Sequence, residues 1–345
     1  MVEMKLNTTQ DVLEQVEQIC NVTEGDLRAW LHKEVLLNAL KFKRDDLETL
    51  DLKIINRAMD EFRYAARVFR PYRKLRKVSI FGSARTPSSD PYYQAAKEFA
   101  HMSVEKGFMV ITGAADGIMK AGNVGAGAKN SFGANILLPF EQGANEIISE
   151  DPKLITFRFF FIRKLFFMME ADAVALFPGG FGTHDEGFET LTLLQTGKAQ
   201  PMPLVLIELP GEDYWESWEG FVKDQLLKRG LISQQDLDLY KIVHSPQEAV
   251  DWICHFYSTY HSMRKVRDKL VVRLEKALTM DQIRELSNSF GDIIRKGEVR
   301  PTKPLRAEED EPHLLQKPRI SFSYNERSAS RLTQMIHTIN QMGRS

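Results

Sequence analysis

A glycine-rich turn that directly follows a short apolar run is the feature that most constrains this chain. Residues 173–177 are all apolar and have the length of a buried parallel strand, and residues 178–186 then read PGGFGTHDE. A strand that ends in glycines and opens into a helix presents backbone N–H groups and the positive helix end to an anion. The helix is predicted to begin at Glu186, with Asp185 and Glu186 in its first turn. A phosphate site beside carboxylates indicates chemistry on a phosphorylated small molecule.

The turn belongs to a segment in which short strands alternate with helices. This alternation is typical of βαβ units and a parallel sheet, whose ligands bind at the carboxyl ends of the strands. The predicted fold class is therefore α/β, a parallel sheet flanked by helices. Strands are predicted at 78–81, 108–112, 134–138 (closed by Pro139), 173–177 and 204–209, and helices at 92–106, 118–130, 158–170, 186–195, 214–229 and 246–260.

Three regions are predicted along the chain. Residues 1–75 form an N-terminal helical region, residues 76–262 the α/β domain and residues 263–345 a small C-terminal α+β extension. The extension is predicted to contain strands at 269–274 and 319–322 and a last helix at 329–341. A further helix is predicted from a capping box at Thr279 to Arg295, with Gly297 as its stop. The loop at 301–318 is rich in proline and acidic residues, and we expect its charges to face solvent.

Bulk composition argues against several classes of protein. The chain has 46 basic and 47 acidic residues, a net charge of −1, which gives no reason to expect binding to nucleic acid or to a membrane. No apolar run approaches the roughly 20 residues that span a bilayer, and the N-terminus has no signal-peptide pattern, so we expect a cytoplasmic protein. The two cysteines lie far apart and form no metal or redox pattern. We expect no metal and no cofactor.

Two further segments place small residues at predicted strand ends. Gly82 and Ser83 follow the first strand, a weak signal when taken alone. Residues 112–119 read TGAADGIM, in which the small residues let a ligand approach the backbone and Gly117 can begin a closely packed helix. Neither segment has the dinucleotide fingerprint GxGxxG or the GK[ST] ending of a P-loop. These mismatches weaken any assignment to NAD or ATP chemistry.

Taken in order, these segments resemble the LOG family, cytokinin riboside 5′-monophosphate phosphoribohydrolases long described as possible lysine decarboxylases. PGGFGTHDE resembles the family's PGGxGTxxE, Arg163 with Lys164 its RK pair, residues 112–119 its TGGGxxG[LIV]M loop, and Gly82 with Ser83 its first-strand GS. The likeness covers about residues 75–260. Two alanines, Ala114 and Ala115, stand where the family has glycines, and the two flanking regions have no counterpart in the short plant-type members.

The resemblance implies a modified Rossmann fold and hydrolysis of the N-glycosidic bond of a nucleoside 5′-monophosphate, such as a cytokinin riboside monophosphate or AMP. The products would be a free base and ribose 5-phosphate. It implies that Glu186 and Arg163 are catalytic, that no cofactor is used, and that the protein is a homodimer or a higher homo-oligomer. The substrate- and phosphate-binding residues that it implies are Gly82, Ser83, Gly113, Gly117, Met119, Lys164, Gly179, Gly180, Gly182 and Thr183.

Other interpretations of these residues stay open. Without the order of the motifs, Glu186 would be an acid placed to complement a helix dipole. Asp185 either orients Glu186 or faces solvent, Lys164 suits a phosphate or carboxylate partner better than a Schiff base, and His184 is assigned no role. The aromatic residues of 157–167 suit a core or a dimer interface better than a platform for stacking bases.

Two alternatives concern the whole protein. The first is a non-catalytic nucleotide-binding regulatory protein, which the two alanines and the flanking regions would permit. The second is a decarboxylase that uses pyridoxal phosphate, for which the sequence offers no convincing lysine context.

Overall fold

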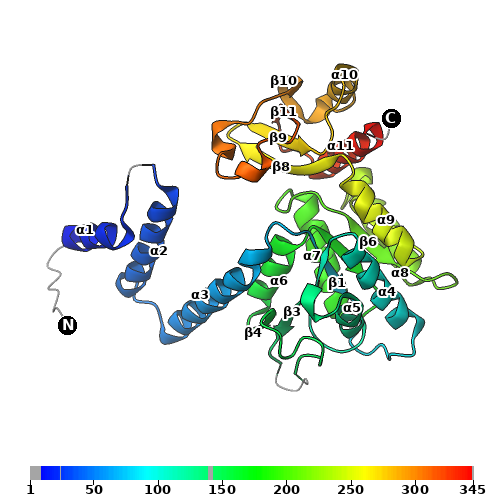
Figure 1. The fold of residues 1–345 in the computed structure, drawn as a ribbon, viewed down its shortest axis with the longest axis horizontal. Coiled ribbons are helices and arrows are strands. Elements are labelled where there is room, and N and C mark those ends of the chain that lie inside the picture. Colours follow the sequence, from blue (N-terminus) through cyan, green and yellow to red (C-terminus); the bar gives the residue numbers. More distant parts are fainter. Residues whose placement is uncertain (1–8, 24, 139–142, 344–345) are drawn as a thin grey trace. The chain divides into compact units, whose positions relative to one another are not determined.

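The computed structural model describes residues 9–23, 25–138 and 143–343 and divides the chain into two compact units, Met1–Arg63 and Tyr64–Ser345. The region boundaries at 75 and 262 stay predictions. Helices α1 (Thr9–Cys20) and α2 (Leu27–Arg44) lie in the first unit, and α3 (Thr49–Phe69) continues into the second (Figure 1). The Asp26 carboxylate caps α2 by accepting the N–H groups of Arg28 and Ala29 at 2.9 and 3.1 Å.

The second unit is built on a seven-stranded parallel sheet, which confirms the predicted α/β class. The central strands are buried along their whole length, because runs of Val, Ile, Leu and Ala are covered on both faces. In the order β4-β3-β2-β1-β5-β6-β7, the sheet consists of β1 (Lys77–Phe81), β2 (Met109–Thr112), β3 (Ser131–Ile136), β4 (Leu154–Phe157), β5 (Ala173–Leu176), β6 (Leu204–Ile207) and β7 (Lys241–Val243).

Helices cover both faces of this sheet. On one face, α4 (Pro91–Glu105), α5 (Ile118–Ala126) and α9 (Pro246–Phe256) pack on alternate strand residues such as Val78 and Ile80. The other face is covered by α6 (Phe160–Glu170), α7 (Phe181–Gln195) and α8 (Tyr214–Phe221), and there the rings of Phe81 and Phe167 lie 4.7 Å apart. Helices α6 and α7, which follow β4 and β5, thus lie on the same side of the sheet as the start of α8.

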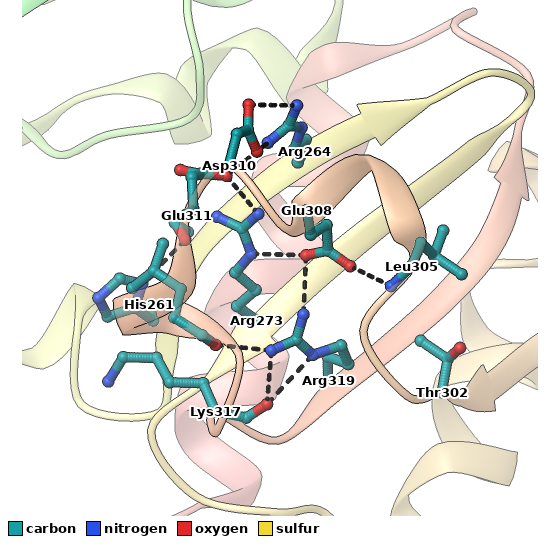
Figure 2. Close-up of polar contacts among 12 residues, drawn as sticks. His261, Arg264, Arg273, Thr302, Leu305, Glu308, Asp310, Glu311, Lys317 and Arg319 are labelled. Atoms are coloured by element: carbon teal, nitrogen blue, oxygen red, sulfur yellow. Dashed lines mark hydrogen bonds and ion pairs between the residues drawn. The ribbon is translucent and has the colours of Figure 1, made fainter. Parts of the chain in front are cut away.

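The C-terminal extension is a four-stranded antiparallel sheet in the order β10-β11-β9-β8, with α10 and α11 packed on one face (Figure 1). On the other face, Arg273 and Arg319 bind the buried carboxylate of Glu308 at 2.9 and 2.8 Å (Figure 2). The elements are β8 (Tyr260–Val266), β9 (Lys269–Leu274), α10 (Met280–Ser289), β10 (Ile294–Pro301), β11 (Arg319–Tyr324) and α11 (Ala329–Met342).

Several predictions about single elements are wrong. Helix α7 begins at Phe181, so Asp185 and Glu186 lie in its second turn and not in its first. The helix predicted to reach Tyr260 ends at Phe256, because Tyr260 begins strand β8. Strand β4 was not predicted at all. Residues 1–8 and Pro139 lie outside the described residues.

The extension also departs from its prediction. Helix α10 ends at Ser289 rather than at Arg295, and Gly297 lies inside β10 with φ +75°, where the pairing with β11 is irregular. The loop at 301–318 was expected to be solvated, but Glu308 within it is fully buried. The capping box at Thr279 is confirmed, since its hydroxyl accepts the Gln282 N–H and the Gln282 side chain accepts the Thr279 N–H.

Two features of the described part of the chain bear on function. Within it, no helix combines the length and the apolar character needed to cross a membrane. The same residues contain no group of three or more His, Cys, Asp or Glu side chains arranged to hold a metal ion. The cytoplasmic location stays a prediction.

Candidate active site

A cavity of about 810 Å³ opens at the carboxyl ends of β1 and β5, which are neighbours in the middle of the sheet. From β1 the sheet continues through β2 to one edge, and from β5 it continues through β6 to the other. The cavity therefore lies at the point where the strand order reverses, which is where open parallel sheets bind ligands. Its lining comes from residues 81–85 after β1, from residues 179–186, and from Met119, Phe160 and Arg163.

The glycine-rich turn forms one wall of this cavity. The Gly180 carbonyl accepts the N–H groups of Thr183 and His184 at 3.0 and 3.2 Å, which starts α7 inside the motif itself. A Cβ atom on Gly179 would collide with the Thr183 side chain, so glycine is required for this close packing. The first N–H groups of a helix have no partner within it, and here Gly180, Phe181 and Gly182, whose N–H groups precede that first bond, line the cavity. This wall is suited to an anion.

Glu186 lies one helical turn beyond that anion site and is only 6% exposed. Arg163 Nη1 is 3.7 Å from its Oε1 atom. Burial raises the pKa of Glu186 to about 7, and the nearby charges of Lys164 and Arg163 only partly oppose this effect. Near neutral pH the carboxyl group therefore populates both its protonated and its ionised form.

The guanidinium of Arg163 is held from several sides. Its Nε donates to the Ala134 carbonyl at 2.7 Å, and the group lies over the Phe167 ring at 5.0 Å. A Cβ atom on Gly113 would come within 2.6 Å of Arg163 Nη2 and of Met119 Sδ. Gly113 therefore makes room for the arginine at the cavity wall.

Lys164 points at carboxylates rather than into the cavity. Its Nζ lies 2.8 Å from Asp185 and 2.9 Å from Glu189, so it joins α6 to α7. Burial alone would lower the pKa of Lys164, but the hydrogen bonds to these two acids raise it. Asp185 is thus the partner of Lys164 on the helix that carries Glu186.

The structure brings together most, but not all, of the residues predicted for the site. Gly117 has φ +64° and packs against the backbone of residues 83 and 84, so its role in this structure is local packing. Gly113, Gly117 and Lys164 do not line the cavity. The predicted residues that do line it are Gly82, Ser83, Met119, Arg163, Gly179, Gly180, Gly182, Thr183 and Glu186.

Sequence reasoning missed two residues at this site. His184, to which no role was assigned, lines the cavity, and its Nε2 lies 2.7 Å from the hydroxyl of Tyr214. That hydroxyl donates to the Gly179 carbonyl at 2.5 Å. Burial lowers the pKa of His184. No local pattern predicts this pairing, because Tyr214 is 30 residues from His184 along the chain.

A larger cavity, of about 900 Å³, lies between the residues that follow α7 and the C-terminal sheet. Its lining includes three carboxylates, and each is paired with a basic residue of the same cavity. The ion pairs hold the pKa of Asp310, Glu311 and Glu326 below the usual range. Self-paired charges of this kind are typical of structural networks, so the cavity at β1 and β5 is the better candidate for chemistry.

Part of the chain is similar in sequence to proteins of a known family. Residues 111–253 match the sequence model of a family described as "Possible lysine decarboxylase". A cytokinin riboside 5′-monophosphate phosphoribohydrolase of Arabidopsis thaliana is 27% identical over 164 residues, which is 46% of this chain and 74% of that protein.

Solved structures also resemble the chain over about half of its length. A molybdenum cofactor binding protein from Rippkaea orientalis is 20% identical with a TM-score of 0.37, over 52% of this chain and 93% of that one. DNA processing protein A from Helicobacter pylori is 16% identical with a TM-score of 0.37, over 53% and 82% of the two chains.

Proposed function

We propose, from its similarity to the LOG family, that the chain hydrolyses the N-glycosidic bond of a nucleoside 5′-monophosphate, releasing a free base and ribose 5-phosphate. One observation carries the proposal. A buried carboxyl group, Glu186, has its pKa raised to about 7 and lies one helical turn from an anion site at the start of α7. A substrate phosphate held at that site would bring the attached ribose toward the carboxyl group.

Binding of the phosphate follows from the start of α7. The N–H groups of Gly180, Phe181 and Gly182 and the Thr183 hydroxyl would hold the 5′-phosphate, and the positive end of the helix would stabilise its charge. Gly82 and Ser83 line the cavity beside this turn, where the Ser83 N–H donates to the Pro178 carbonyl at 3.1 Å, and they would limit where the ribose lies. Holding the phosphate fixes the sugar ring relative to Glu186, which lowers the entropic part of the barrier.

In the bond-breaking step, the bond between ribose C1′ and the base nitrogen breaks and its electron pair leaves with the base, which takes up a proton. Positive charge then builds on the ribose ring, as in glycoside hydrolysis generally. The ionised Glu186 would stabilise this cation, and it can accept a proton from the water whose oxygen bonds to C1′. The Arg163 guanidinium, held by the Ala134 carbonyl, would fix the carboxylate or a substrate oxygen.

A direct assay tests the proposal. Purified protein is incubated separately with AMP and with isopentenyladenosine 5′-monophosphate, and free base is measured by chromatography. We expect base release from at least one of them, with equimolar ribose 5-phosphate. Tight nucleotide binding without any base release would reject hydrolysis and favour the alternative, a nucleotide-binding regulatory protein. Ala114 favours that alternative, since it replaces a family glycine at a backbone φ of +62°.

A homo-oligomer is also proposed, and exposed apolar residues on α6 support it. Phe161, Leu165 and Met169 are 58, 43 and 49% exposed and follow one another at four-residue intervals, so they form one stripe on the helix. Light scattering at assay concentration tests this, and a monomeric mass would contradict it.

A further inference from the structure

A chain of hydrogen bonds connects His184 to the backbone of the glycine-rich turn through Tyr214. His184 Nε2 lies 2.7 Å from the Tyr214 hydroxyl oxygen, which lies 2.5 Å from the Gly179 carbonyl oxygen. His184 lines the proposed substrate cavity, whereas Tyr214, the first residue of α8, does not. The hydrogen-bond chain therefore runs from the cavity lining at His184 to the turn through Tyr214, which is not part of that lining.

The direction of each hydrogen bond follows from the groups themselves. A carbonyl oxygen only accepts, so the single hydroxyl proton of Tyr214 goes to Gly179. The hydroxyl oxygen must then accept a hydrogen bond from His184, which requires the imidazole N–H to be on Nε2. Burial lowers the pKa of His184, so at neutral pH the ring is uncharged and is held in this tautomer.

The Gly179 carbonyl matters because it belongs to the peptide that joins Gly179 to Gly180. In a trans peptide the C=O and the following N–H point in opposite directions. Since the Gly179 carbonyl is held toward Tyr214, the Gly180 N–H is directed to the opposite side, where Gly180 lines the cavity. A peptide between two glycines rotates easily, because neither residue has a Cβ atom to restrict it. Without a partner for the carbonyl, the N–H would lose its fixed orientation.

The two side chains are themselves held by aromatic packing. The His184 ring lies 5.8 Å from the rings of Tyr214 and Trp215 and 6.4 Å from that of Phe188. Trp215 is 1% exposed, and its backbone N–H donates to the buried carboxylate of Glu208, the residue that follows β6. The start of α8, and with it Tyr214, is therefore anchored to the sheet.

We propose that Tyr214 and His184 are positioning residues that hold the Gly179–Gly180 peptide with its N–H toward the 5′-phosphate of the substrate. This rests on the proposed phosphate site at the start of α7. Neither side chain takes part in bond breaking. Their effect is on phosphate binding, so it appears only for substrates that carry a phosphate.

The test compares a phosphorylated substrate with its unphosphorylated counterpart. Tyr214→Phe removes only the hydroxyl, and we expect KM for AMP to rise about tenfold, the effect of one lost hydrogen bond, with kcat nearly unchanged. The value of kcat/KM for adenosine, which has no phosphate, should not change. His184→Phe should act like Tyr214→Phe, whereas His184→Gln should restore most of the affinity, because its amide N–H can replace Nε2–H.

Tyr240→Phe is the matched control. Tyr240 packs against Trp218 in the same aromatic cluster, but its hydroxyl bonds to Glu219 and not to the turn. We expect its KM for AMP to equal that of the wild type. An unchanged KM for AMP in Tyr214→Phe, or equal losses for AMP and adenosine, would overturn the inference.

Failure of the proposed function would appear separately, as absence of base release by the wild-type protein. The inference is then tested by calorimetric binding of AMP and adenosine to the same variants. Tyr214→Phe should weaken AMP binding about tenfold and leave adenosine binding unchanged, and any other pattern rejects the positioning role.

Discussion

Two buried carboxylates, Glu186 in the candidate active site and Glu308 in the C-terminal extension, have opposite electrostatic surroundings. Glu308 is fully buried and binds Arg273 at 2.9 Å, Arg319 at 2.8 Å and the Leu305 N–H at 3.0 Å (Figure 2). Burial alone would raise the pKa of Glu308, but these bonds outweigh it and lower the pKa. Glu186 has one arginine nitrogen at 3.7 Å, and burial raises its pKa to about 7.

This difference in surroundings distinguishes Glu308, a carboxylate with a structural role, from Glu186, the carboxylate of the candidate active site. In the extension, every group that faces Glu308 neutralises its charge or donates to it, so the network joins residues 305–311 to the sheet. At Glu186 the charge is only partly balanced, and a cavity lies beside it. A carboxylate left in this condition can change protonation near neutral pH or stabilise a positive charge that forms only during a reaction.

The largest expected effect is on activity. Glu186→Gln keeps the shape of the side chain but cannot be ionised, so we expect kcat/KM for base release to fall roughly 1,000-fold while AMP binding is retained. Steady-state assays and calorimetry measure the two quantities. Glu216→Gln, an exposed acid on α8, is the control and should have wild-type activity. Normal turnover by Glu186→Gln would remove the distinction between the two carboxylates.

The second effect concerns stability. Glu308→Gln leaves Arg273 and Arg319 buried without their charged partner, so we expect the free energy of unfolding to fall by about 3–5 kcal/mol. Urea denaturation of the full chain measures it. Glu298→Gln, which breaks the exposed pair with Arg300, is the control and should change stability by less than about 1 kcal/mol. A loss of that small size in Glu308→Gln would mean that the buried network contributes little.

Urea denaturation of Glu186→Gln should show the opposite change, an increase in the free energy of unfolding. The folded-state pKa of Glu186 is about 7 against an ordinary 4.5, so ionisation destabilises the fold increasingly as pH rises from 4.5 to 7. Glutamine removes this cost, and we expect a gain of up to about 3 kcal/mol at pH 8. The gain should disappear below pH 4.5, where Glu186 is protonated in both the folded and the unfolded wild-type protein. A destabilised variant at pH 8 would show that the ionised group is well compensated after all.

The sequence predicted the sheet and the glycine-rich turn, because each follows from a local pattern, and the placement of Glu186 beside an anion site stays a prediction. It did not predict that α7 starts at Phe181, since glycines disfavour helices by about 1 kcal/mol each. Tertiary packing outweighs that cost here, because Gly187 lets α7 lie against Leu176 of β5. The partners of Glu308 were also missed. They lie 35 and 11 residues away, and only folding of the extension brings them together.

The smallest effect tests what sets the pKa of Glu186. Among the charges that oppose burial, that of Lys164 acts most strongly, and Lys164 also neutralises Asp185 and Glu189, whose charges raise this pKa. Lys164→Gln should therefore move the acidic limb of the profile of kcat/KM against pH from about 7 to higher pH, by about one unit, which lowers the rate about fivefold at pH 7 and about tenfold well below it. Lys120→Gln, which breaks an exposed pair with Glu146, should leave the limb in place. If the limb stays fixed in Lys164→Gln or moves to lower pH, the group that titrates is not Glu186. The partly balanced charge of Glu186 is then not what distinguishes Glu186 from Glu308.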